Sequence, residues 1–94
     1  EALIVFMPPL HRLEEDNING DGSKVPMGNL KVYINILKEV LEFYSIPTLD
    51  LWACSGIQPK VDVLKEKYCP DGLHPNDAGH KLIADRLAGF LKTL

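Results

Sequence analysis

The sequence has little of what marks membrane, nucleic-acid-binding or disulfide-rich proteins. No apolar run among its 94 residues approaches the ~18–20 residues that a membrane helix needs. The ten Lys and Arg residues are scattered and the net charge is −3, so no basic stripe is present to bind nucleic acid. Cys54 and Cys69 are too few for a disulfide framework and lack metal-site spacing. They are expected to be two thiols or, in an exported protein, a single bridge.

The remaining composition, 46% hydrophobic and 24% charged, is ordinary for a soluble globular domain of either a cytoplasmic or a secreted protein. Residues 2–7 are continuously apolar, which is the pattern of a strand covered on both faces. Residues 10–27 are polar and rich in Asp, Asn and Gly, and they predict a long loop. Apolar residues then recur with helical spacing, so an amphipathic helix is predicted over 30–44, with Asn29 as its N-cap.

The second half of the chain predicts one more strand and two more helices. Residues 48–53 read as a short strand after Pro47, and 61–68 as a short helix. A turn-rich loop over 70–75 leads to a last helix, capped by Asn76 or Asp77.

This order predicts an α/β fold in which two parallel strands are joined by a right-handed crossover. Two strands of the buried type cannot cover each other's faces and edges, and isolated strand pairs are marginal in water. The chain is therefore expected to be part of a larger sheet. The other strands would come from an N-terminal segment, a second chain or a swapped copy.

The most informative stretch runs from Pro70 to His80. Asp71 lies three residues before His74, with Gly72 between them, so the carboxylate can fold back and accept Nδ1–H of the imidazole. Such a bond fixes the tautomer and leaves Nε2 free to act as a general base toward a hydroxyl. A solvated histidine after a common Asp-Gly turn is the alternative that spacing alone leaves open.

Asp71-x-x-His74-Pro75, followed by Asn76-x-x-Gly79-His80-x-x-Ile83-Ala84, resembles the last conserved block of the SGNH/GDSL hydrolases, or GDSL-like lipases. The resemblance implies that residues 1–94 are the C-terminal part of one such domain, the second half of a flavodoxin-like, three-layer parallel sheet. It implies hydrolysis of acyl or acetyl esters, with Asp71 orienting His74 as general base and no metal or organic cofactor. Small-molecule esters, including acylated carbohydrates and lipids, are the implied substrates.

The family's nucleophile lies in an N-terminal Gly-Asp-Ser block, which cannot be placed in this sequence. Ser23 follows Gly-Asp-Gly within the predicted loop, Ser45 ends a helix, and Ser55 lies in a loop, so none is predicted to be the nucleophile. The chain would then supply only Asp and His of the triad. The alternative function is that of a non-catalytic α/β fragment that associates with another chain.

Four further predictions concern single residues and one short motif. Loops at the C-terminal ends of parallel strands border active sites, so His11 and Leu10 are predicted to line the substrate pocket. Residues 17–22 begin like a calcium loop, but Gly28 takes the place of its acidic twelfth ligand, so a solvated turn is predicted. Trp52 is predicted to pack in the core, and His80 to pack or form a hydrogen bond.

Overall fold

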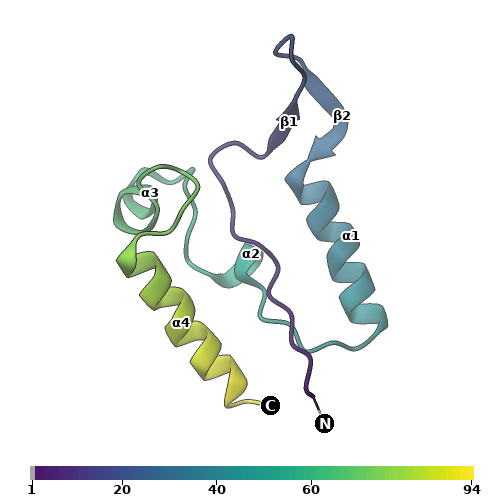
Figure 1. The fold of residues 1–94 in the computed structure, drawn as a ribbon, viewed down its shortest axis with the longest axis vertical. Coiled ribbons are helices and arrows are strands. Elements are labelled where there is room, and N and C mark those ends of the chain that lie inside the picture. Colours follow the sequence, from purple (N-terminus) through teal and green to yellow (C-terminus); the bar gives the residue numbers. More distant parts are fainter. Residues whose placement is uncertain (1) are drawn as a thin grey trace.

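The computed structural model of the protein describes residues 2–94 and belongs to the α/β class. Residues 2–94 form an extended N-terminal segment, a hairpin and four helices. Figure 1 shows how these elements are arranged. In chain order the elements are β1 (Asp16–Ile18), β2 (Lys24–Asn29), α1 (Leu30–Phe43), α2 (Leu51–Cys54), α3 (Asp62–Tyr68) and α4 (Asp77–Leu91).

The molecule is flat, because its elements lie beside one another in about one layer. In Figure 1, α1 and α4 stand on opposite sides, with the extended N-terminal segment and α2 between them. The principal extents are 49 × 32 × 19 Å and the radius of gyration is 15.0 Å, whereas a compact domain of this length has about 12.4 Å. The accessible surface of 6568 Å² likewise exceeds the roughly 5,400 Å² expected for this mass. The described residues therefore do not close around a core of ordinary size.

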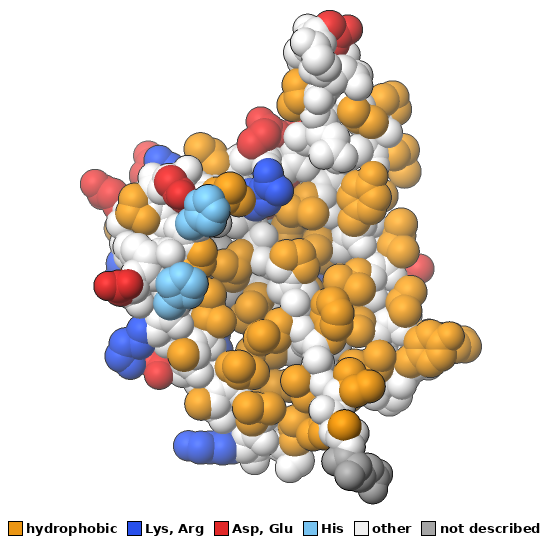
Figure 2. Space-filling view, viewed as in Figure 1, with side chains coloured by type: hydrophobic (Ala, Val, Ile, Leu, Met, Phe, Trp, Pro, Cys, Tyr) orange, Lys and Arg blue, Asp and Glu red, His pale blue; other side chains and the backbone are white. Residues whose placement is uncertain are grey.

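The buried apolar set is correspondingly small. Its members come from α1, α2 and the segments on either side of α3: Ile34, Leu41, Leu51, Ile57 and Cys69. Many other large apolar side chains are exposed, and Figure 2 shows them gathered over the middle of the molecule and along α1. We call one set of them the apolar side; it comprises Leu3, Ile4, Phe6, Met7, Tyr33, Ile36, Val40, Phe43 and Tyr44.

The two predicted strands meet, but only at one point. Phe6 and Thr48 form a single parallel bridge, in which Phe6 N–H donates to Pro47 O (3.0 Å) and Leu49 N–H donates to Phe6 O (2.9 Å). The strand predicted over 48–53 is wrong beyond this bridge, because Asp50 caps α2 by accepting a hydrogen bond from Ala53 N–H (3.1 Å). Residues 2–94 thus form no parallel, flavodoxin-like sheet, and their one sheet is antiparallel.

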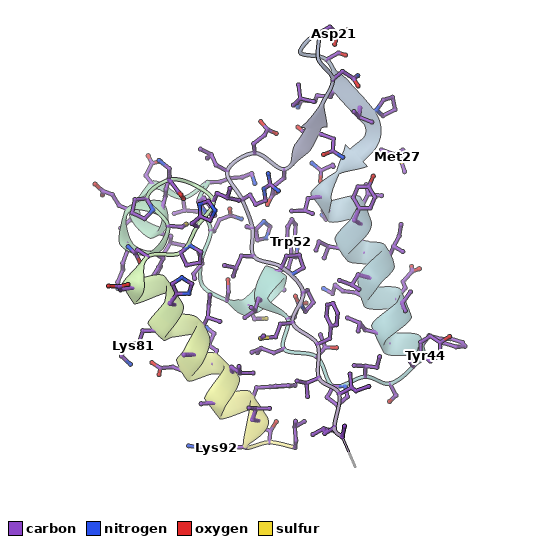
Figure 3. All side chains as sticks on the ribbon, viewed as in Figure 1. Asp21, Met27, Tyr44, Trp52, Lys81 and Lys92 are labelled. Carbon is purple, nitrogen blue, oxygen red and sulfur yellow. The ribbon has the colours of Figure 1, made fainter. Side chains whose placement is uncertain are left out.

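The long loop predicted over 10–27 is also wrong in part, because it contains the hairpin of β1 and β2. The residues of the calcium-like motif lie in β1 and in the turn, where Asp21 Oδ1 accepts hydrogen bonds from Ser23 N–H (2.9 Å) and Ser23 Oγ (2.6 Å). The base of the hairpin is closed by Leu30 N–H, which donates to Glu15 O (2.7 Å). Figure 3 shows Asp21 at the tip of this hairpin and Met27 on its outer edge.

The predicted helices are confirmed. Asn29 caps α1 by accepting from Lys31 N–H (2.9 Å), and Asn76 caps α4 by accepting from Gly79 N–H (2.9 Å). The short helix predicted over 61–68 corresponds to α3. None of the helices formed by residues 2–94 has both the length and the apolarity required to cross a bilayer.

Candidate active site

Asp71 and His74 form a hydrogen-bonded couple in the loop between α3 and α4. Asp71 Oδ2 lies 2.7 Å from Nδ1 of His74. The other carboxylate oxygen, Oδ1, accepts hydrogen bonds from the backbone N–H groups of Leu73 (2.8 Å) and His74 (2.7 Å). The side chain of His74 is 76% exposed and that of Asp71 is 54% exposed, so the ring is open to a reacting group. With Nδ1–H donated to Asp71, Nε2 is the nitrogen left to accept a proton.

The same contacts keep Asp71 ionised. The N–H of Leu73, the imidazole of His74 and the N–H of His74 lower the pKa of the Asp71 carboxyl from 3.8 to about 2. Hydrogen bonds to the charged form of a carboxylate favour that form. At neutral pH Asp71 is therefore a carboxylate oriented by its own backbone, and it can stabilise a positive charge on His74.

Gly72 gives the loop its tight reversal and its contact with the N-terminal segment. Its φ of +80° lies in the left-handed region, which side chains with a Cβ rarely adopt. A Cβ at this position would lie 2.9 Å from Cβ of Leu13, and Leu13 N–H donates to Gly72 O (2.9 Å). This bond joins the loop to a segment nearly sixty residues earlier in the chain (72 − 13 = 59 positions).

Asn76 and Gly79 hold the other end of the loop against α3. Besides capping α4, Asn76 donates from its backbone N–H to Tyr68 O (2.8 Å) and from Nδ2 to Lys67 O (3.0 Å). Gly79 is buried, and a Cβ there would lie 2.6 Å from Tyr68 O and 2.9 Å from Cβ of Pro75. Asn76 and Gly79, two residues of the motif, thus have a hydrogen-bonding and a steric reason for their identity. We call residues 69–76 the acid–base corner.

None of the three serines forms a hydrogen bond with His74 among the described residues. Ser23 bonds to Asp21 in the hairpin turn, and Ser45 is exposed at the end of α1. Ser55 is buried, and its Oγ accepts from Ile57 N–H (3.0 Å). In residues 2–94 the acid and the base are therefore together, and no serine accompanies them.

The predicted pocket residues lie in a different environment. His11 donates from Nδ1 to Glu15 Oε2 (2.7 Å), and its ring stacks on that of Trp52 with the centroids 3.5 Å apart. Figure 3 shows Trp52 in the centre of the molecule, close to the N-terminal segment. Leu10 is half-buried. Neither of these two pocket candidates contacts the couple by a hydrogen bond, whereas Leu13 does contact its loop.

Other single-residue predictions have mixed outcomes. Trp52 packs on His11, but from α2 and not from a strand. His80 is exposed, so the prediction that it packs is wrong. Cys54 and Cys69 are free, so the single-bridge alternative is wrong for this structure. Within residues 2–94 no three His, Cys, Asp or Glu side chains gather to hold a metal ion.

Three residues next to the corner escaped sequence reasoning: Leu13, Glu15 and Lys60. Leu13 lines a groove of about 230 Å³ beside Asp71, together with Arg12, Glu14, Asp71, Gly72 and Leu73. Glu15 and Lys60 form an ion pair at 2.6 Å. The sequence holds one indication of them, since Glu15 follows His11 by four residues. Side chains four positions apart form a pair only when the backbone between them has a suitable conformation, and the sequence does not specify that conformation here.

Comparison with known proteins places this fold in longer chains. No protein-family model and no curated protein matches the sequence. One crystal structure is 34% identical, with a TM-score of 0.78 over 99% of this chain and 44% of its own. Another, of a protein from Lactobacillus plantarum, is 26% identical, with a TM-score of 0.74 over 95% of this chain and 43% of its own. The chain thus spans less than half the length of either similar protein.

Proposed function

We propose that this chain supplies the acid and the general base of a Ser-His-Asp esterase of the SGNH/GDSL type. The observation that carries the proposal is the couple itself: an ionised carboxylate 2.7 Å from Nδ1, with an exposed ring beyond it. A hydroxyl nucleophile needs a base oriented in this way. The capping hydrogen bond of Asn76 and the close packing of Gly79 support the resemblance, because both residues belong to the motif.

In the proposed reaction a serine outside these residues attacks the acyl carbon of an acyl or acetyl ester. His74 accepts the serine proton at Nε2, and Asp71 stabilises the imidazolium that forms. His74 then returns the proton to the leaving alcohol, and the acyl-enzyme is hydrolysed with His74 activating the water. No metal or organic cofactor takes part in these steps.

The proposal includes a fold larger than the described residues. We propose that the N-terminal segment is a strand of a flavodoxin-like parallel sheet, whose remaining strands and nucleophile belong to the rest of a longer protein. The parallel bridge of Phe6 and Thr48 supports this, and so do the exposed apolar side chains of Leu3, Ile4, Phe6 and Met7. Parallel sheets are stable when both of their faces are covered, and these four side chains are not covered by the described residues.

The test is His74→Ala in the complete protein, with p-nitrophenyl acetate as substrate. We expect kcat to fall by more than ~10³-fold, because the serine loses its base. His80→Ala is the matched control, since His80 is exposed and makes no side-chain hydrogen bond in the described residues. Activity of His74→Ala within a few-fold of the unmodified enzyme would refute the assignment.

One observation favours a second function, that of a non-catalytic fragment that binds another chain. Large exposed apolar surfaces mark interaction sites, and the side chains of the apolar side are exposed in the described residues. A fluorophosphonate probe separates the two functions, because it labels only an activated serine. We expect no labelling of the 94-residue chain alone and labelling of the complete protein; an unlabelled complete protein would favour the second function.

A further inference from the structure

Glu15 is a carboxylate whose side chain is only 10% exposed and whose two oxygens are both engaged. Oε2 lies 2.7 Å from Nδ1 of His11 and accepts from Arg12 N–H (3.1 Å), and Oε1 pairs with Lys60 Nζ at 2.6 Å. Burial raises the pKa of the Glu15 carboxyl, but the hydrogen bonds from Lys60, Arg12 N–H and His11 outweigh it, so that the pKa lies below its ordinary value. Glu15 is therefore a charged group at the centre of a small polar cluster.

Lys60 ties this cluster to the segment that leads into α3. Its Nζ donates to Arg12 O (2.8 Å) in addition to its ion pair with Glu15. Lys60 directly precedes Val61, the N-cap residue of α3, and the acid–base corner follows the C-terminal end of that helix. The ion pair thus joins residues 12–15 to the segment that precedes α3.

The cluster reaches the corner through Leu13, which lies between Arg12 and Glu15. Leu13 N–H donates to Gly72 O, and the Leu13 side chain fills the space where a Cβ of Gly72 would lie. Among the described residues, this is the one backbone hydrogen bond between the corner and a distant part of the chain. Asp71 and His74 are themselves exposed, so the backbone of their loop decides how the two side chains face each other.

We infer that Glu15 and Lys60 are positioning residues for the Asp71–His74 couple. Their ion pair fixes residues 11–15, Leu13 then holds Gly72, and the loop keeps Asp71 in the orientation in which its carboxylate meets Nδ1 of His74. The catalytic part of this inference rests on the proposed function, whereas the structural part does not. Small displacements of catalytic groups are costly, because a shift of about 1 Å can lower a rate by ~10²-fold.

The test uses Lys60→Met in the complete protein, because Lys60 is 44% exposed and Met retains an unbranched apolar side chain of similar length. We expect kcat for p-nitrophenyl acetate to fall about 10-fold while KM changes by less than about 2-fold. In NMR titration the pKa of the Asp71 carboxyl should rise from about 2 toward 3.8, and hydrogen exchange of the Leu13 amide should accelerate about 10-fold.

Three further variants complete the design. Lys60→Arg retains the charge and should restore all three values. Lys81→Met breaks the exposed ion pair with Asp85 on α4 and should change none of them. Glu15→Gln removes the same ion pair from the other side and should reproduce Lys60→Met. Should Glu15→Gln fail to fold, Lys60→Met still decides the question.

Unchanged Leu13 exchange and Asp71 titration in Lys60→Met would overturn the inference, whatever happens to kcat. A protein that hydrolyses no ester but shows both changes would instead refute the proposed function and leave the positioning role in place. The two failures are therefore distinguishable.

Discussion

The acid–base corner and the apolar side of this molecule differ in how completely their side chains find partners among the described residues. In the corner, exposed polar groups are held by short hydrogen bonds to neighbours in the same loop, to α3 and to Leu13. On the apolar side, large side chains of the N-terminal segment and α1 lie exposed in a molecule only 19 Å thick. The corner is thus complete within the described residues, and the apolar side is not. Local hydrogen bonding can therefore hold an acid–base couple in place in a molecule whose apolar side is left open.

The largest expected effect tests the corner through its carboxylate. Asp71→Asn in the complete protein should lower kcat for p-nitrophenyl acetate by about 10³–10⁴-fold, because Asn cannot stabilise the imidazolium and favours the wrong tautomer. Asp77→Asn, in the first turn of α4, is the control and should change kcat by less than about 2-fold. A similar loss of kcat in both variants would show that the reaction does not depend specifically on the Asp71 carboxylate.

The next effect compares two neighbouring residues of α1, one buried and one on the apolar side. Leu41→Ala should lower the free energy of unfolding of the 94-residue chain by about 2–4 kcal/mol, because it opens a cavity. Val40→Ala should change it by less than about 0.5 kcal/mol, because Val40 is exposed. Urea unfolding measures both. A Val40 cost as large as that of Leu41 would mean that the apolar side is covered in solution, for example by self-association.

A smaller effect compares two glycines of α4. Gly79→Ala should cost about 1–3 kcal/mol in the same assay, because its Cβ would press on Tyr68 O. Gly89→Ala should stabilise the chain by about 0.5–1 kcal/mol, since nothing lies within 4 Å of a Cβ there and Ala favours the helix. Equal effects at the two positions would show that the start of α4 does not pack against α3 as described.

The smallest effect is a pH dependence within the corner. The pKa of Asp71 in the folded corner, about 2, is below its ordinary value of 3.8. Its contribution to the order of the loop is therefore fully present above pH 3.8 and is lost as the pH falls through about 2. Carbon NMR of the carboxyl group measures this titration directly. A midpoint near 3.8 would show that the hydrogen bonds from Leu73 and His74 do not persist.

Where the sequence predicts structure well, the determinants are local. The caps Asn29 and Asn76 accept hydrogen bonds from backbone N–H groups two or three residues ahead. Asp71 forms a hydrogen bond with the ring of His74, three positions ahead. Short-range hydrogen bonds of this kind join residues that are close in the sequence, so the helix starts and the pairing of Asp71 with His74 could be predicted.

The predictions that the structure contradicts concern residues whose partners are distant in the sequence, or segments in which the local signals conflict. Asp50 looked like part of a strand, yet it caps α2 and pairs with Lys38 of α1 at 2.8 Å. The hairpin was missed although Asn19-Gly20 and Asp21-Gly22 are turn pairs, because the strands beside them are polar. The role of Glu15 depends on Lys60, 45 positions later (60 − 15 = 45), and no spacing rule connects the two.

The hairpin has a consequence for how proteins of this fold can diverge. Leu30 N–H and Glu15 O close its base, so residues 16–29 leave the body of the molecule and return to nearly the same point. Insertions and deletions are best tolerated where a chain segment begins and ends at adjacent positions and its tip is exposed. Homologues can therefore lengthen, shorten or exchange this arm, and acquire a new contact at its tip, without moving Glu15 or the residues that depend on it.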